Sequence, residues 1–165
     1  ADPPFSLVIL DRMMPNLDGM EFLRRMKAEP RFDGWRFMPV GGPGDRPPAT
    51  PALEAAGPRG IDFVGKGDIM ASAAAIDRAD LFVGNDSGLM HVAAALNRPL
   101  VALYGPSSPD FTPPLSHKAR VIRLITGYHK VRKGDAAEGY HQSLIDITPQ
   151  RVLDELNELL LSEEG

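Results

Sequence analysis

The chain has 165 residues, of which 43% are hydrophobic and 24% charged, so we expect neither a disordered segment nor a membrane-spanning protein. Its formal net charge of −4 at pH 7 argues against a general binder of nucleic acid. The chain has no cysteine, which excludes disulfides and thiolate chemistry and fits the reducing, cytoplasmic location that we expect.

Strand-like and helix-like runs alternate in the first third of the chain. "SLVIL" (6–10) is a continuous apolar run, typical of a strand buried on both faces. "DGMEFLRRMKAE" (18–29) has apolar residues at helical spacing, with Asp18 as the expected N-cap. "WRFMPV" (35–40) predicts a weaker strand, because Pro39 removes one hydrogen-bond donor from the sheet.

A turn-rich loop, "GGPGDRPPATP" (41–51), comes next and leads into a short helix, "ALEAAG". "IDFVG" (61–65) predicts a third strand, and Asp68 is the expected N-cap of the helix in "IMASAAAIDRA" (69–79). Three further strands are predicted at "LFVG" (81–84), "LVALYG" (100–105) and "RVIRLI" (120–125).

The last helix has the clearest signature in the chain. Thr148 and Pro149 stand at its start, where a capping hydroxyl and a residue without an N–H are favoured. Its apolar stripe consists of Val152, Leu153, Leu156, Leu159 and Leu160. We therefore expect a helix with one buried face.

Strands that alternate with helices predict a parallel sheet covered on both faces. We expect residues 1–165 to form a single α/β domain, a three-layer Rossmann-like or flavodoxin-like fold. Its mainly parallel sheet should have about six strands in the order 3-2-1-4-5-6. Such sheets bind ligands beyond the carboxyl ends of the strands where the order reverses, here between strands one and four.

One strand, turn and helix at this edge, "LFVGNDSGLMHVAAAL" (81–96), carries a candidate anion site. The first N–H groups of a helix have no partner within the helix, so they favour phosphate. Gly88 would let a ligand approach, Ser87 adds a hydroxyl, and His91 lies one turn further on. Asp86 would repel phosphate and is better suited to capping or to receiving a hydroxyl or amine. An ordinary N-cap with a packed core histidine is the alternative.

Residues from about 41 to the end resemble the C-terminal domain of glycosyltransferase family 9, the ADP-heptose transferases of the lipopolysaccharide core. "NDSGLMH" is the most specific part of the resemblance, within "DRADLFVGNDSGLMHVAAALNRPLVALYGPSSPDFTPP" (77–114). The resemblance implies a Rossmann-like domain that holds ADP or ADP-heptose. It places Asp86, Ser87, Gly88 and His91 at the diphosphate, and Asp45 and Lys66 near the ribose and adenine.

The first forty residues look different. "PFSLVILDRMMPNLDGMEFLRRMKAEPRF" (4–32) resembles the middle of a response-regulator receiver domain, with Asp11 in the position of the phosphoacceptor. Gly41 and Gly42 stand where that family has a hydroxyl, so the phosphorylation site would be incomplete. These observations predict a chimera, engineered or recombinant, that joins residues 1–40 of one family to residues 41–165 of another.

Three hypotheses about function follow. The first is a module that binds ADP or ADP-heptose without transferring sugar by itself, with Mg²⁺ bridging if Asp11 and Asp18 face the diphosphate. The second is a folded scaffold without a ligand, and the third is a receiver-like module phosphorylated at Asp11. We assign no catalytic residue and no metal ligand. Beyond a nucleotide sugar, the partner we consider is a second copy of the chain, bound through exposed apolar surface.

Overall fold

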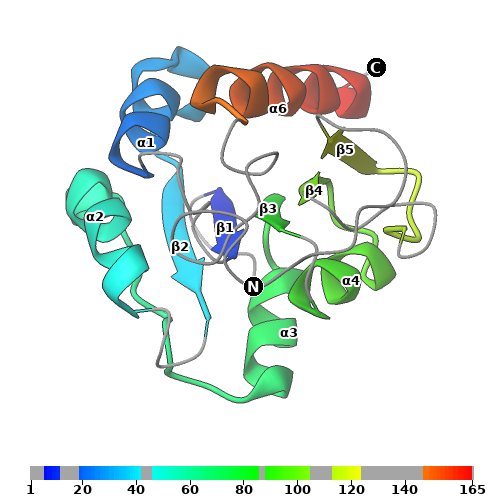
Figure 1. Cartoon of the computed structure of the whole chain (residues 1–165), viewed down its shortest axis with the longest axis horizontal. Helices are drawn as coiled ribbons and strands as arrows, with labels where there is room; N and C mark the ends of the chain where they lie inside the picture. The colour runs from blue at the N-terminus through cyan, green and yellow to red at the C-terminus, as the bar shows by residue number, and fades with distance from the viewer. Residues whose placement is uncertain are drawn as a thin grey trace, which may run out of the picture.

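A computed structural model describes residues 6–11, 19–41, 46–85, 88–104, 113–123 and 147–164 (Figure 1). Within these ranges a five-stranded parallel sheet has the order β2-β1-β3-β4-β5. The strands are β1 (Leu7–Asp11), β2 (Arg36–Val40), β3 (Leu81–Asn85), β4 (Leu100–Tyr104) and β5 (Ala119–Arg123). The prediction of a three-layer α/β fold with a mainly parallel sheet is confirmed.

The prediction of a strand over residues 61–65 is wrong, although this segment does lie beside β2 as expected. It makes one parallel bridge, between Phe37 and Gly60, and the Ile61 N–H donates to the Phe37 carbonyl at 2.8 Å. Without this strand, the predicted order 3-2-1-4-5-6 reduces to the observed order of five strands. The reversal of strand order therefore lies beside β1, as predicted.

Pro39 explains why the sixth strand does not form. The Arg36 N–H donates to the Ser6 carbonyl on the β1 side, and N–H directions alternate along a strand. Position 39 therefore faces residues 60–65, and proline has no N–H to donate there. The ladder ends after one bridge, and β2 keeps its full pairing with β1.

Helices cover both faces of the sheet. On one face lie α1 (Gly19–Ala28), α2 (Arg46–Ala56) and α6 (Pro149–Glu164), and on the other α3 (Ile69–Asp77) and α4 (Gly88–Ala95) (Figure 1). Short 3-10 turns follow α1 and α2, at η1 (Pro30–Phe32) and η3 (Gly57–Arg59). Among the described residues, none of the helices combines the length and the apolar character needed to cross a bilayer.

The helix starts test the capping predictions. Asp68 accepts the Ala71 N–H at 2.9 Å, and the Thr148 hydroxyl accepts the Arg151 N–H at 3.1 Å, so these two predicted caps form. The third predicted cap, Asp18, lies outside the described residues. Helix α2 begins at Arg46, six residues before the predicted helix. The prolines of this segment predict a loop, but Pro47 and Pro48 fit the first turn of a helix, where N–H groups have no partner within the helix.

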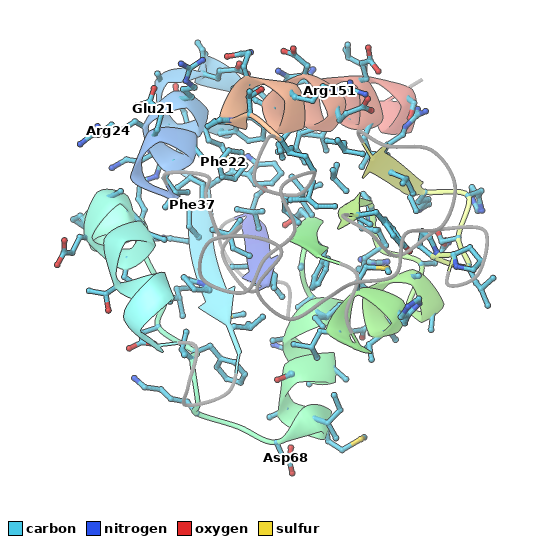
Figure 2. The ribbon with its side chains drawn as sticks, in the orientation of Figure 1. Glu21, Phe22, Arg24, Phe37, Asp68 and Arg151 are labelled. Atoms are coloured by element: carbon cyan, nitrogen blue, oxygen red, sulfur yellow. The ribbon has the colours of Figure 1, made fainter. Side chains whose placement is uncertain are left out.

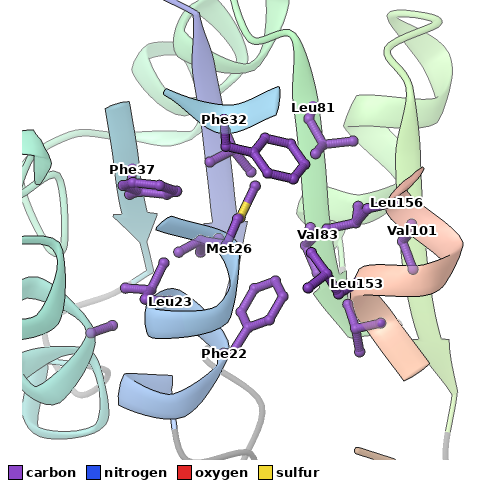
Figure 3. Close-up of a cluster of buried hydrophobic side chains, with 14 of the residues drawn as sticks. Phe22, Leu23, Met26, Phe32, Phe37, Leu81, Val83, Val101, Leu153 and Leu156 are labelled. Atoms are coloured by element: carbon purple, nitrogen blue, oxygen red, sulfur yellow. The ribbon is translucent and has the colours of Figure 1, made fainter. Parts of the chain in front are cut away.

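Strand β1 divides the core into two clusters. Val8 and Leu10 face α1 and α6, whereas Leu7 and Ile9 face α3 and α4. The first cluster is shown in Figure 3, where aromatic and aliphatic side chains of α1 and α6 meet over the sheet. Its fully buried members include Phe22, Leu23, Met26, Phe32, Leu153 and Leu156. The N-terminal strand and helix thus share one core with the rest of the sheet.

Helix α6 is tied to α1 and η1 by polar contacts between distant parts of the chain. The Arg25 guanidinium donates to the Gln150 side chain at 2.9 Å. The Asn157 amide donates to the Glu29 carboxylate at 3.0 Å, and its backbone carbonyl accepts from Arg31 at 3.1 Å. The outward sides of both helices carry charges such as Glu21, Arg24 and Arg151 (Figure 2). The last helix, whose position the sequence left open, therefore packs on this sheet.

Candidate functional site

The carboxyl ends of three neighbouring strands form the candidate site. Asp11, the last residue of β1, is in register with Val40 of β2 on one side and with Gly84 of β3 on the other. The segments that follow these strands all leave from this edge of the sheet. Asp11 thus lies one strand spacing from the carboxyl end of β3, and the prediction that it faces the turn after β3 stays a prediction.

The start of α4 lies at the same edge. Strand β3 ends at Asn85 and α4 begins at Gly88, so only two residues join them. Gly88 is exposed, and a Cβ atom added to it would meet no atom of the described residues within 4 Å. A ligand therefore has room to approach the first turn of α4, where the N–H groups and the helix dipole favour an anion.

Helix α4 is apolar on its inner side. Met90, Ala93 and Ala94 are buried against the sheet, whereas His91 is only partly buried. Its position one turn into the helix allows both readings of the sequence, a ligand contact and a packed histidine. Asp86 and Ser87, the other predicted contacts in this turn, lie outside the described residues.

A third segment, the loop from Ile61 to Asp68, is tied to this edge by a hydrogen bond. The Gly65 N–H donates to the Gly41 carbonyl at 2.8 Å, immediately after β2. Gly65 has φ +68° and Gly41 has φ +153°, conformations that favour glycine. The neighbouring residue Lys66 is thereby held near the carboxyl end of β2, and its contact with a nucleotide stays a prediction.

Lys66 has a partner that the sequence reasoning missed. Its ammonium lies 3.6 Å from Asp62 Oδ2, and the two side chains are 55% and 30% exposed. The other carboxylate oxygen, Asp62 Oδ1, accepts the Val64 N–H at 3.2 Å. An acid four residues before a lysine, with glycine between them, was the available signal.

Two further residues predicted for the site, Asp45 and Asp18, cannot be placed. Asp45, expected near the ribose and adenine, and Asp18, considered with Mg²⁺, lie outside the described residues. Among the residues that the structure describes, no group of three or more His, Asp or Glu side chains is placed to hold a metal ion. The described part of the candidate site therefore consists of Asp11, Gly88, His91 and Lys66 at the carboxyl edge of the sheet.

Comparison with known proteins shows the family to which the chain belongs. The family model of glycosyltransferase family 9 (heptosyltransferase) matches residues 34–141, and the chain belongs to this family. Among curated relatives, lipopolysaccharide heptosyltransferase 2 of Escherichia coli (strain K12) is 94% identical over 83 residues, which are 50% of this chain and 24% of the relative.

Solved structures extend the similarity over nearly the whole chain. The structure of E. coli ADP-heptose lps heptosyltransferase II has a TM-score of 0.79 and 44% identity, covering 98% of this chain and 48% of that one. The E. coli heptosyltransferase WaaC with ADP shares the fold, with a TM-score of 0.70 at 20% identity, covering 96% of this chain and 46% of that one. The chain thus spans about a quarter of the curated relative and about half of the solved chains.

The prediction of a chimera is wrong. One heptosyltransferase structure covers 98% of the chain, so the first forty residues fit the fold of the same family as the rest. The engineered scaffold and the receiver module with Asp11 as phosphoacceptor are not supported either. The receiver likeness rested on a buried strand, a polar strand end and an amphipathic helix. Many parallel α/β folds share this local pattern, which therefore does not separate the families.

Proposed function

We propose that this chain is the donor-binding part of an ADP-heptose glycosyltransferase and that it binds ADP or ADP-heptose at the carboxyl edge of β1 and β3. The observation that carries the proposal is Gly88, exposed and open at the start of α4, within the segment that the family model matches. The start of a helix beside a reversal of strand order is a site where parallel sheets bind nucleotide phosphates.

The proposed contacts divide by the part of the ligand they would meet. Gly88, His91, Asp86 and Ser87 are assigned to the diphosphate side, because they belong to the turn that opens α4. Lys66 and Asp45 are assigned to the ribose and adenine side. The relatives support this choice of ligand, since one was solved with ADP and another is described as an ADP-heptose transferase.

Heptose transfer to lipopolysaccharide is the activity that we propose for the whole protein, because the relatives carry names of that activity. A cytoplasmic location and a single domain over residues 1–165 belong to the same proposal. A homodimer stays a prediction. Among the described residues, the large apolar side chains left exposed are Ile69, Met70, Leu115 and Leu161.

The test is a two-dimensional amide NMR titration of the labelled chain with ADP, with and without Mg²⁺. We expect saturable shifts at Gly88 and His91. Gly88→Val should weaken ADP binding at least tenfold, because its side chain fills the space through which the phosphate approaches. Ala95→Val, at the exposed far end of the same helix, is the matched control and should bind like the unmodified chain. Equal binding by both variants would refute the assignment to this turn.

A further inference from the structure

Residues 59–65 follow the outer edge of β2 in a constant register, although they form no strand. The Ile61 N–H donates to the Phe37 carbonyl, and the Gly65 N–H donates to the Gly41 carbonyl, both at 2.8 Å. Donor and acceptor are separated by the same number of residues in the two pairs. The segment therefore has the same register on β2 at both of its ends.

Arg59 continues this register beyond the amino end of β2. Its Nε atom donates to the Trp35 carbonyl at 2.9 Å, across the same separation in sequence. Carbonyl directions alternate along a strand, so the carbonyls of Trp35, Phe37 and Gly41 all point toward residues 59–65. The guanidinium thus supplies a donor at the position where the backbone of a longer strand would offer its next N–H.

The Arg59 side chain is held on two further sides. Its Nη2 atom donates to the Phe32 carbonyl, and its guanidinium carbon lies 5.0 Å from the centre of the Phe37 ring. Both phenylalanines are fully buried, and Phe32 packs edge-on against Trp35 with 5.2 Å between the ring centres. A planar guanidinium can make these directed bonds together, whereas the ammonium of a lysine cannot reproduce their geometry. Arg59 therefore joins residues 59–65 to the packed core.

Because Pro39 interrupts the ladder, the register of this segment needs such an anchor. Within the described part of the chain, the segment forms one bridge with β2, so few backbone contacts define its register. A slip of one residue would turn the buried side chain of Val64 outward, at the cost of its burial. A slip of two residues keeps each side chain on its face and would carry Lys66 about 7 Å along the edge. The bonds of Arg59 oppose this second slip.

We propose that Arg59 is a positioning residue of the candidate site, which fixes the register of residues 60–65 on β2 and thereby holds Lys66 at the carboxyl end of that strand. This inference rests on the proposed function, which assigns Lys66 to the ribose and adenine side. Arg59 itself lies at the other end of β2 and contacts no ligand. The start of α4 follows β3, so the diphosphate side does not depend on this register.

The experiment compares Arg59→Lys with Arg25→Met, each in the Lys66 and the Lys66→Met background. Arg25 also makes two directed bonds, to Glu21 and Gln150, but it lies on α1, so it is the matched control for a loss of stability alone. Far-ultraviolet circular dichroism checks that every variant is folded. ADP and inorganic pyrophosphate are the probes, and their dissociation constants are measured well below the unfolding temperature.

A second readout needs no ligand. Hydrogen exchange of the Ile61 and Gly65 amides reports directly on the two hydrogen bonds that define the register. Arg59→Lys should speed the exchange of both amides, whereas Arg25→Met should leave their rates as they are relative to the rest of the sheet. Unchanged exchange in Arg59→Lys would overturn the proposal.

We expect Arg59→Lys to weaken ADP binding about three- to tenfold and to leave pyrophosphate binding within about twofold. The loss should vanish in the Lys66→Met background, because Arg59 acts through Lys66. Arg25→Met should leave both dissociation constants unchanged. Equal weakening of ADP and pyrophosphate would overturn the proposal, because it would show a general loss of structure, and so would a loss that survives Lys66→Met.

The outcomes separate this inference from the proposed function. If ADP shifts the amides of Gly88 and His91 but binds equally to the unmodified chain and to Arg59→Lys, the proposed function stands and the inference fails. If the unmodified chain binds no ADP at millimolar concentration, the proposed function fails. The exchange rates then decide the register on their own, since faster exchange at Gly65 in Arg59→Lys supports the role of Arg59 and unchanged exchange refutes it.

Discussion

The helical face over α1 and α6 and the carboxyl edge of the sheet are built from opposite kinds of contact. On the face, Phe22 and Leu156 are fully buried, and polar contacts join residues more than a hundred positions apart, such as Arg25 and Gln150. At the edge, Gly88 is open and Lys66 is 55% exposed. The face should therefore determine stability and the edge ligand binding, and substitutions should separate the two.

The largest expected effect lies in the helical face. Phe22→Ala removes a fully buried ring from the cluster in Figure 3 and should lower the free energy of unfolding by about 3–5 kcal/mol. Urea denaturation followed by circular dichroism measures it. Glu21→Ala, next to it on the solvent side, is the control and should cost less than about 0.5 kcal/mol. A loss below about 1 kcal/mol for Phe22→Ala would mean that the packing of α1 is described wrongly.

Gly67, in the loop from Ile61 to Asp68, is an exception to this separation, because its substitution should affect stability and ligand binding together. Gly67→Ala puts a Cβ atom 2.8 Å from the Ala71 Cβ, so the loop must shift, at a cost of about 1–3 kcal/mol. The shift should also move Lys66, which we assign to the ribose and adenine side, and weaken binding of ADP. Gly88→Ala enters open space and should be neutral or stabilising by up to about 1 kcal/mol. Equal stability of the two alanine variants would contradict this account of the loop.

Asp68, which ends the same loop, should affect stability through the cap of α3 (Figure 2). Asp68→Ala removes the acceptor of the Ala71 N–H and should cost about 1 kcal/mol, whereas Asp68→Asn keeps an acceptor and should cost little. Thermal unfolding of the two variants side by side measures the difference. If both lose the same stability, charge rather than capping is the cause.

The smallest effect is expected on the outer side of α1. Arg24 lies 3.7 Å from Glu21 and its side chain is 60% exposed, while Glu21 also has Arg25 at 2.8 Å. Arg24→Ala should change the free energy of unfolding by less than about 0.5 kcal/mol, and by less still at high salt. Chemical denaturation at two salt concentrations tests this, and a larger loss would require a role for Arg24 in packing.

Local sequence signals predicted the parts of the fold that depend on neighbouring residues. Asp68 and Thr148 were predicted as caps because the capping oxygen and the N–H it accepts are three residues apart in sequence. The strand at 61–65 failed for a reason that is not local. Whether the missing N–H of Pro39 faces β1 or the next segment depends on how β2 is oriented in the sheet.

In the candidate site, too, local sequence signals succeeded where contacts between distant or folded segments could not be predicted. The motif after Asn85 predicts Gly88 and His91, whereas Lys66 is predicted from the family resemblance, and the structure places Gly88 and Lys66 at the carboxyl edge of the sheet. Asp62 was missed, because its link to Lys66 depends on the folded turn. The resemblance of residues 4–32 to a receiver domain was misleading because it rested on local pattern alone. A buried strand followed by an amphipathic helix looks alike in many parallel folds.

Pro39 has one more consequence, for association between molecules. The outer edge of β2 is where a strand of another chain would add to the sheet, but proline offers no N–H there and residues 60–65 lie against it. The feature that stops a sixth strand from forming therefore also protects this edge against aggregation by strand addition.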